Sequence, residues 1–127
     1  MNEKEWLTKE EFFADFDADP VLRAEWERLA LARAIGDAVL SYRVEHQLSQ
    51  GALAKKLGMR QSNIARLEAA EHNPSLDMLQ RLSEKLGLRF VVDVAPAAAV
   101  ALTLPPGTAP VQELTTSEGT RVLVAAG

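Results

Sequence analysis

The sequence of 127 residues contains no cysteine, which excludes a disulfide framework, a thiolate metal site and a cysteine nucleophile. It also lacks an apolar stretch long enough to cross a bilayer, because the longest candidate, residues 91–104, includes Asp93 and Pro96. The first eleven residues are charged and contain no apolar run, so we expect no signal peptide. These absences predict a cytoplasmic protein without a membrane partner.

Residue patterns that carry catalysis are missing as well. The two histidines, His46 and His72, lie near expected helix ends and do not have a metal-binding spacing such as two histidines four apart on a helix. No serine has an evident base, and no glycine-rich loop could hold a phosphate. The acidic residues among positions 1–19 crowd a terminal segment without a framing pocket. We therefore expect no enzymatic activity, no metal and no cofactor.

A uniform positive charge is also lacking, because the chain carries a net charge of −4. The charge is uneven, however. Residues 1–39 contain five Lys or Arg and ten Asp or Glu, residues 40–90 contain eight and five, and residues 91–127 contain one and three. A basic middle between acidic ends is typical of one face that binds nucleic acid and of flanks with another role. The length allows one domain with extensions.

The pattern in residues 48–75 predicts a short helix, a tight turn and a second helix. Ser49 is a good N-cap, because its hydroxyl can accept a hydrogen bond from an otherwise unpaired backbone N–H. Leu53 and Leu57 lie four residues apart and therefore share one face of the first helix. Gly58 can adopt a positive φ without a steric clash, which suits a tight turn.

The second helix, residues 61–70, combines an apolar stripe with a polar row. Ile64 and Leu67 face the core. The outer faces carry glutamine, asparagine and arginine, the side chains that can bond base edges in pairs. The two helices predict a helix-turn-helix, which places one helix in the major groove of DNA. The alternative is an ordinary helical hairpin with a solvated face. The polar row is Gln61, Ser62, Asn63 and Arg66.

Residues 39–87 resemble the Cro/C1-type, XRE-like helix-turn-helix domain of bacterial and phage regulators. The resemblance implies that Gln50, after the capping serine, touches a DNA phosphate. It also implies that Gln61 and Ser62, and Arg66 one turn later, read bases. The candidate DNA-binding residues are therefore Ser49, Gln50, Arg60, Gln61, Ser62, Asn63 and Arg66.

The same resemblance implies a largely buried ion pair between Arg43 and Glu68, because their counterparts in phage repressors often form one. The alternative is that both side chains are merely exposed. Two positions depart from the family pattern. Arg60 stands where the family prefers a capping Ser or Thr. Ala70 stands where the family often has Gly, so we expect a less sharp exit from the second helix.

The chain before residue 48 is predicted to be helical. Thr8 and Glu11 form a capping box for a helix over 9–16. Asp19 and Pro20 then begin a long helix over residues 20–46, with Gly36 as the expected point of division.

The chain after residue 74 predicts one more helix and then strands. The helix over 75–86 is expected to bury a stripe of leucines. Alternation after Gly87 predicts a strand, and residues 95–110 read as a linker with a strand at 99–104. Residues 111–115 and 120–125 flank a hairpin turn with Gly119 in a left-handed conformation; the alternative is a disordered tail. The leucine stripe is Leu76, Leu79, Leu82 and Leu86, and the first strand carries Phe90, Val92 and Val94.

These elements predict a mainly α fold. It consists of a Cro/C1-type five-helix helix-turn-helix domain with an N-terminal helical extension and a short C-terminal β segment. The expected divisions are an acidic N-terminal extension over 1–35, the DNA-binding domain with its trailing strand over 36–95, and an Ala/Pro-rich linker with a hairpin tail over 96–127.

This layout looks like that of HigA-type antitoxins, and the runs 60–68 and 73–76 are typical of that group. Their toxins resemble RelE, a small basic ribonuclease that cuts mRNA on the ribosome. The resemblance implies a homodimer that binds double-stranded operator DNA, neutralises a RelE/HigB-like toxin and represses the shared operon. The alternative is a stand-alone Cro/C1-type transcriptional repressor without a toxin partner. Residues 97–127 lie outside the resemblance.

The expected toxin-binding surface is the acidic, aromatic N-terminal segment. Its acids would attract a basic ribonuclease, and its aromatic side chains could anchor the complex. The alternative is that the aromatic side chains fold back onto Leu22 and Trp26 as core. The candidate toxin-binding residues are Trp6, Glu10, Glu11, Phe12, Phe13, Asp15, Phe16 and Asp17.

Overall fold

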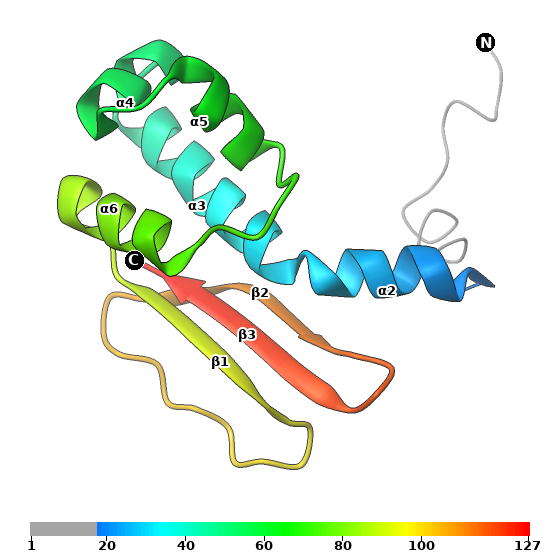
Figure 1. Ribbon diagram of the computed structural model, residues 1–127. Coiled ribbons are helices and arrows are strands. Elements are labelled where there is room, and N and C mark those ends of the chain that lie inside the picture. The colour runs from blue at the N-terminus through cyan, green and yellow to red at the C-terminus, as the bar shows by residue number, and fades with distance from the viewer. Residues whose placement is uncertain (1–17) are drawn as a thin grey trace, which may run out of the picture.

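The computed structural model describes residues 18–127, so the expected helix over 9–16 lies outside the described residues. Within this range five helices are followed by three strands (Figure 1). Helices α3 to α6 pack together, the sheet lies below them, and α2 extends away from the bundle. The bounds are α2 Pro20–Arg28, α3 Ala30–Glu45, α4 Gln50–Leu57, α5 Gln61–Glu68, α6 Leu76–Leu86, β1 Phe90–Pro96, β2 Ala109–Thr115 and β3 Thr120–Ala126.

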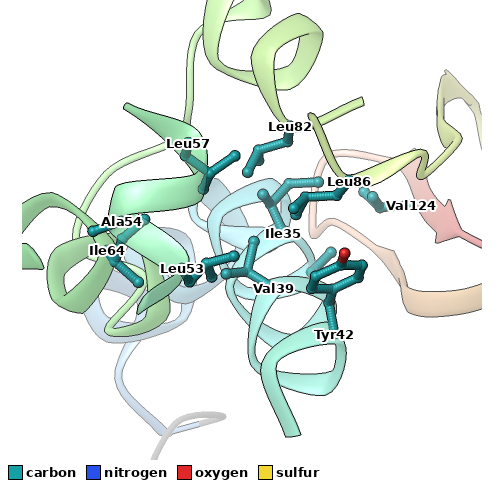
Figure 2. Close-up of a cluster of buried hydrophobic side chains, with 11 residues drawn as sticks. Ile35, Val39, Tyr42, Leu53, Ala54, Leu57, Ile64, Leu82, Leu86 and Val124 are labelled. Carbon is teal, nitrogen blue, oxygen red and sulfur yellow. The ribbon is translucent and has the colours of Figure 1, made fainter. Parts of the chain in front are cut away.

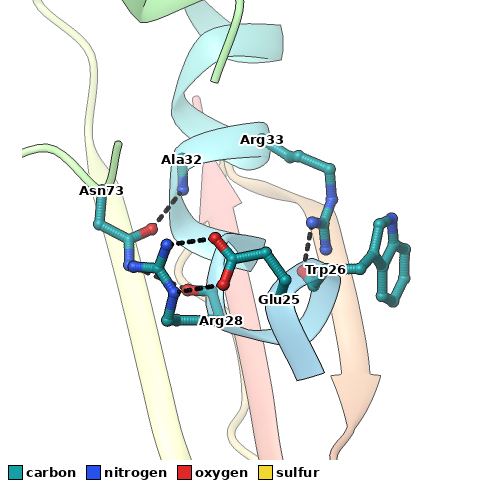
Figure 3. A network of polar contacts seen from close by, with 6 residues as sticks. All are labelled: Glu25, Trp26, Arg28, Ala32, Arg33 and Asn73. Carbon is teal, nitrogen blue, oxygen red and sulfur yellow. Dashed lines mark hydrogen bonds and ion pairs between the residues drawn. The ribbon is translucent and has the colours of Figure 1, made fainter. Parts of the chain in front are cut away.

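The long helix expected over residues 20–46 is divided at Leu29, so the expectation of a division at Gly36 is wrong. Leu29 has φ −96° and ψ 18°, and it separates α2 from α3. The side chain of Asn73 holds this break. Its Nδ2 donates to the carbonyl oxygen of Arg28 at 2.9 Å, and its Oδ1 accepts from the N–H of Ala32 at 3.0 Å (Figure 3). A residue far along the chain therefore sets the boundary.

Gly36 has a different role from the one expected. A Cβ atom at this position would lie 2.7 Å from the carbonyl oxygen of Leu67. The glycine therefore allows α3 to pass close to the C-terminal end of α5, and it does so inside a continuous helix.

The helix-turn-helix is built as the local signals indicate. The hydroxyl of Ser49 accepts from the N–H of Ala52 at 3.0 Å, and Gly58 has a φ of 67°. Arg60 is the N-cap of α5 and forms no capping hydrogen bond with its side chain. The exit from α5 is sharper than expected, because the helix ends at Glu68 and Ala70 adopts a φ of 55°.

The hydrophobic core joins all parts of the described fold except α2. Figure 2 shows the buried side chains around α3, with contributions from α4, α5 and α6. Val124 of β3 is fully buried in the same cluster. The sheet is therefore part of the core of the helical domain. The largest fully buried side chains are Ile35, Val39, Leu53, Leu57, Ile64, Leu82 and Val124.

The three strands form an antiparallel sheet in the order β1-β3-β2. Val92 of β1 and Gln112 of β2 both lie opposite Val124 of β3, and Gly119 in the hairpin turn has a φ of 86°. The strand expected at 99–104 is wrong. Because β3 lies between β1 and β2, this segment has to cross from one edge of the sheet to the other.

The connection between β1 and β2 is held by Arg121. Its Nη1 donates to the carbonyl oxygen of Ala99 at 3.0 Å, and its Nη2 donates to that of Val100 at 3.2 Å. Asp93 lies 3.9 Å from the same guanidinium. The segment forms no strand pairing here, and the hydrogen bonds from Arg121 fix its backbone instead.

Helix α6 is capped by Ser75, whose hydroxyl accepts from the N–H of Met78 at 3.1 Å. Leu82 and Leu86 are buried as expected. The expectation is wrong for Leu76, which is 71% exposed. Met78 and Leu79 of the first turn pack against the core, whereas Leu76, the first residue of α6, lines an open groove between α6 and β1.

Candidate nucleic-acid interface

The polar row of α5 lies on the surface, as a recognition helix requires. Gln61, Ser62, Asn63 and Arg66 are exposed, whereas Ile64 on the opposite face is fully buried. Helix α4 packs against α5 and fixes its orientation. These four side chains are therefore available for base contacts, and that role stays a prediction.

Gln50 is linked to the ion pair between Arg43 and Glu68, which the structure contains. Arg43 Nε donates to Glu68 Oε2 at 2.9 Å, and Arg43 Nη2 donates to Glu68 Oε1 at 2.8 Å. Gln50 Nε2 donates to the same Oε1 at 3.2 Å. An amide nitrogen carries two N–H groups, so one of them is left for a phosphate. The network thus orients the expected phosphate contact.

The electrostatics of this ion pair favour its charged form. The side chains of Arg43 and Glu68 are only 20% and 9% exposed. The hydrogen bonds from Arg43 hold the pKa of the Glu68 carboxyl below its ordinary value, against the opposing effect of burial. The same bonds raise the pKa of Arg43. Because the pair is bidentate and shielded, it connects α3 firmly to the end of α5.

Arg66 is held in an exposed ion pair. Its Nε lies 3.2 Å from Glu71 Oε2, and the two side chains are 62% and 48% exposed. Exposed pairs of this kind contribute about 0–1 kcal/mol. Arg66 can therefore leave Glu71 at little cost in order to reach a base.

The other two candidates lie beside α4 and α5. Ser49 and Arg60 are exposed N-cap residues. Both precede helix N-termini, where backbone N–H groups and the helix dipole favour a phosphate. Their contribution to DNA binding stays a prediction.

Sequence reasoning missed a polar cluster at the junction of α2 and α3 (Figure 3). The guanidinium of Arg33 lies 3.9 Å from the centre of the Trp26 ring, and its Nη1 donates to the carbonyl oxygen of Trp26. Its Nε and Nη2 are buried without a hydrogen-bond partner among residues 18–127. Burial lowers the pKa of Arg33, while Asp37 acts in the opposite direction. No local pattern in the sequence indicates this cluster.

The candidate toxin-binding residues at positions 6–17 lie outside the described residues. The described part of the extension expected over 1–35 consists of α2 and the start of α3, and α2 leaves Val21 77% and Leu22 49% exposed. The amide of Ser117, in the hairpin turn, donates to Glu27 Oε1 at 3.2 Å. This bond connects α2 to the sheet.

Residues 18–127 contain neither a metal-binding cluster nor a helix that could span a membrane. No group of His, Cys, Asp or Glu side chains in this range could hold a metal ion. None of the helices described is long and apolar enough to span a membrane.

Comparison with known proteins agrees with this geometry. A family profile described as helix-turn-helix matches residues 39–92. The chain is also similar to Antitoxin HigA1 from two strains of Mycobacterium tuberculosis, CDC 1551 / Oshkosh and ATCC 25618 / H37Rv. Each is 37% identical over 79 residues, which make up 61% of this chain and 53% of the relative. The chain thus spans about half the length of the curated relatives it matches.

The fold and the profile match define the class of domain at residues 39–92, which is a helix-turn-helix domain built on α4 and α5. The resemblance to HigA-type antitoxins is confirmed by the similarity to Antitoxin HigA1.

Proposed function

We propose that this protein is a DNA-binding antitoxin that represses its own operon and neutralises a RelE/HigB-like toxin that cleaves mRNA. The observation that carries the proposal is the exposed polar row of α5 on a helix-turn-helix, in a chain similar to Antitoxin HigA1. The charge distribution supports it, because the basic middle of the chain contains this helix.

The proposed DNA complex contains a homodimer on an inverted repeat. Each α5 enters the major groove, and the half-sites lie about 34–36 Å apart or a multiple of that spacing. The sheet offers a surface for dimerisation, because one edge of β1 is unpaired within residues 18–127. Beside that edge, Leu76, Val92 and Val94 are 71%, 44% and 63% exposed. Pairing of two β1 edges would cover these side chains.

The proposed toxin contact lies in residues 1–35. The first nineteen residues contain seven Asp or Glu and two Lys, and a ribonuclease needs a basic surface to hold RNA. Electrostatic attraction would speed the encounter, and buried aromatic side chains would slow dissociation. The surface of α4 and α5 stays free for DNA.

One experiment separates the two activities. The product of the reading frame that adjoins this gene is purified, and its binding to the full chain and to a chain without residues 1–18 is measured. Operator binding is measured for the same two proteins. We expect the truncation to abolish or sharply weaken toxin binding and to leave operator binding nearly intact. Full neutralisation by the truncated chain would place the contact elsewhere.

Two further outcomes contradict parts of the proposal. If the full chain binds its own promoter no better than random duplex at moderate salt, the repressor function fails. If it binds the promoter but no adjoining gene product, the protein is a stand-alone repressor and the antitoxin function fails.

A further inference from the structure

The outer face of α3 is open to solvent along two turns. Leu40 and Val44 lie one turn apart on this face and are 40% and 67% exposed. No element among residues 18–127 covers them, although the opposite face of the same helix is the centre of the core. The remaining exposed residues of this face are Asp37, Ser41 and Glu45.

A cleft of about 260 Å³ runs beside this face, between α3 and β2. Its apolar lining comes from Ala38, Leu88 and Val111, together with the alanine and proline at the start of β2. Tyr42 forms one wall. Its hydroxyl accepts from Lys56 Nζ at 2.8 Å, and its ring stacks on His46 with centroids 3.9 Å apart. Lys56 and His46 thus fix the position of the Tyr42 side chain.

Two carboxylates line the same cleft. Asp37 and Glu45 are exposed, and neither forms an ion pair or a hydrogen bond with any residue in 18–127. Other acids of the helical part, such as Glu25, Glu27 and Glu68, are paired with arginines. Asp37 acts on Arg33 only through space, without a contact. An apolar cleft lined by two exposed carboxylates is complementary to a segment that carries both aliphatic and basic side chains.

The position of the cleft leaves the DNA-binding helices free. Its lining residues come from α3, from the segment before β1 and from the sheet, and none comes from α4 or α5. In Figure 1 the sheet lies on the opposite side of α3 from α4 and α5. A second copy of this chain is a poor occupant, because two such faces would bring four carboxylates together.

We propose that the outer face of α3 and the α3–β2 cleft, defined by Asp37, Leu40, Val44, Glu45 and Val111, form a docking surface for a basic segment of the toxin. The proposal rests on the antitoxin function proposed above. It adds a second contact that is separate from residues 1–18. Aliphatic side chains of the toxin enter the cleft, and its Lys or Arg side chains pair with Asp37 and Glu45.

The test uses the full chain and the purified product of the adjoining reading frame as the probe. The double variant Asp37→Lys/Glu45→Lys reverses the charge of the cleft. Its matched control, Glu84→Lys/Glu118→Lys, makes the same change in net charge at two exposed positions outside the cleft. We expect the association rate constant to fall by about tenfold or more for the cleft variant and to change less for the control.

A second variant tests the apolar part. Val44→Ser should raise the dissociation rate constant several-fold and leave the association rate constant nearly unchanged, because it removes contact area without changing charge. Operator binding should match the parent protein for all variants, since the substituted residues are exposed and lie outside α4 and α5. Asp37 acts electrostatically on the partly buried guanidinium of Arg33, so the melting temperature of each variant is measured as well, and Glu45→Lys alone tests the charge of the cleft with Asp37 in place.

The outcomes are distinct. If the parent protein binds the probe and the cleft variant associates no more slowly than the control, the docking surface is wrong and the antitoxin function stands. If the parent protein does not bind the probe at all, both fail. We expect the cleft variant to bind the operator as the parent protein does and to bind the probe more weakly.

Discussion

At the scale of single residues, the DNA-binding face and the core meet at one carboxylate. Glu68 accepts from Arg43 on one side and from Gln50 on the other. The expected phosphate contact is therefore oriented by a partly buried ion pair, whereas the expected base contacts of α5 are exposed side chains. Substitutions at these two kinds of position should have different consequences.

The substitution Gln61→Ala should relax sequence preference. Loss of a side chain that bonds a base edge costs about 1–3 kcal/mol of discrimination at one base pair. Gln50→Ala is the matched control, because loss of a phosphate contact weakens all sequences more evenly. Binding of both variants to an operator series with single base changes would check this. Equal losses on every duplex for both variants would contradict the assignment of Gln61.

The substitution Glu68→Ala should damage folding. Removal of one partner leaves Arg43 without its counter-charge. Breaking a fully buried pair costs roughly 3–5 kcal/mol; because the side chains of Arg43 and Glu68 keep 20% and 9% of their surface exposed, we expect a loss of stability smaller than that range. Thermal unfolding would measure it. An unchanged melting temperature would show that the pair does not stabilise the fold.

The same pair predicts a dependence of stability on pH. The pKa of Glu68 is lower in the folded state than in the unfolded state. Its stabilisation is thus fully present above about pH 4.5, the ordinary value for this group, and is lost as the pH falls through the lowered pKa. Glu68→Gln should flatten this acid limb of the stability curve.

At the scale of elements, two contacts between distant parts of the chain decide where helices end and how closely they pack. Asn73, in the connection between α5 and α6, bonds both sides of the break between α2 and α3. Gly36 lets α3 approach the end of α5. Neither contact can be recognised from the local pattern of apolar residues.

Gly36→Ala should destabilise the protein although alanine is the better helix former. Its Cβ would lie 2.7 Å from a backbone oxygen, and overpacking of this kind costs about 1–3 kcal/mol. Gly51→Ala is the control, because its Cβ would lie 3.6 Å from the end of the Gln61 side chain, an ordinary contact. It should stabilise α4 by up to about 1 kcal/mol. Denaturant unfolding of both variants compares the two effects.

Asn73→Ala should loosen the junction of α2 and α3. It removes the N-terminal cap at Ala32 and the bond to the Arg28 carbonyl, each of which contributes about 1 kcal/mol. Asn73→Asp keeps the acceptor for Ala32 and loses only the donor. Hydrogen exchange should therefore rise at residues 30–33 in the alanine variant and less in the aspartate variant. Equal protection in both would show that the cap has no role.

At the scale of the whole molecule, the helical part and the sheet share one core. Val124 of β3 is fully buried among side chains of the helices. Val124→Ala should therefore lower the melting temperature of the entire domain, by the equivalent of about 1–3 kcal/mol. Val94→Ala, at a position 63% exposed, makes the same chemical change as a control. A separate unfolding transition for the sheet would contradict the shared core.

Features that depend on residues close together in the sequence could be predicted, and features that depend on residues far apart could not. The turn at Gly58, the cap Ser49 and the hairpin turn at Gly119 depend on neighbours within a few residues, and the sequence indicated all of them. The break at Leu29 and the support of the 97–108 connection depend on Asn73 and Arg121, which lie far away along the chain. Exposure of Leu76 depends on where α6 extends past the core. Such features require the tertiary arrangement.

The strand order also sets the sequence of events during synthesis. β3 lies between β1 and β2 but follows both along the chain. Until β3 leaves the ribosome, β1 and β2 have no partner in the sheet, and the site of Val124 in the core is empty. Helices α3 to α6 are complete before this stage and pack through more local contacts. We therefore expect closure of the sheet to be a late, non-local step that slows folding, and we expect nascent chains that lack β3 to expose unpaired strand edges to aggregation.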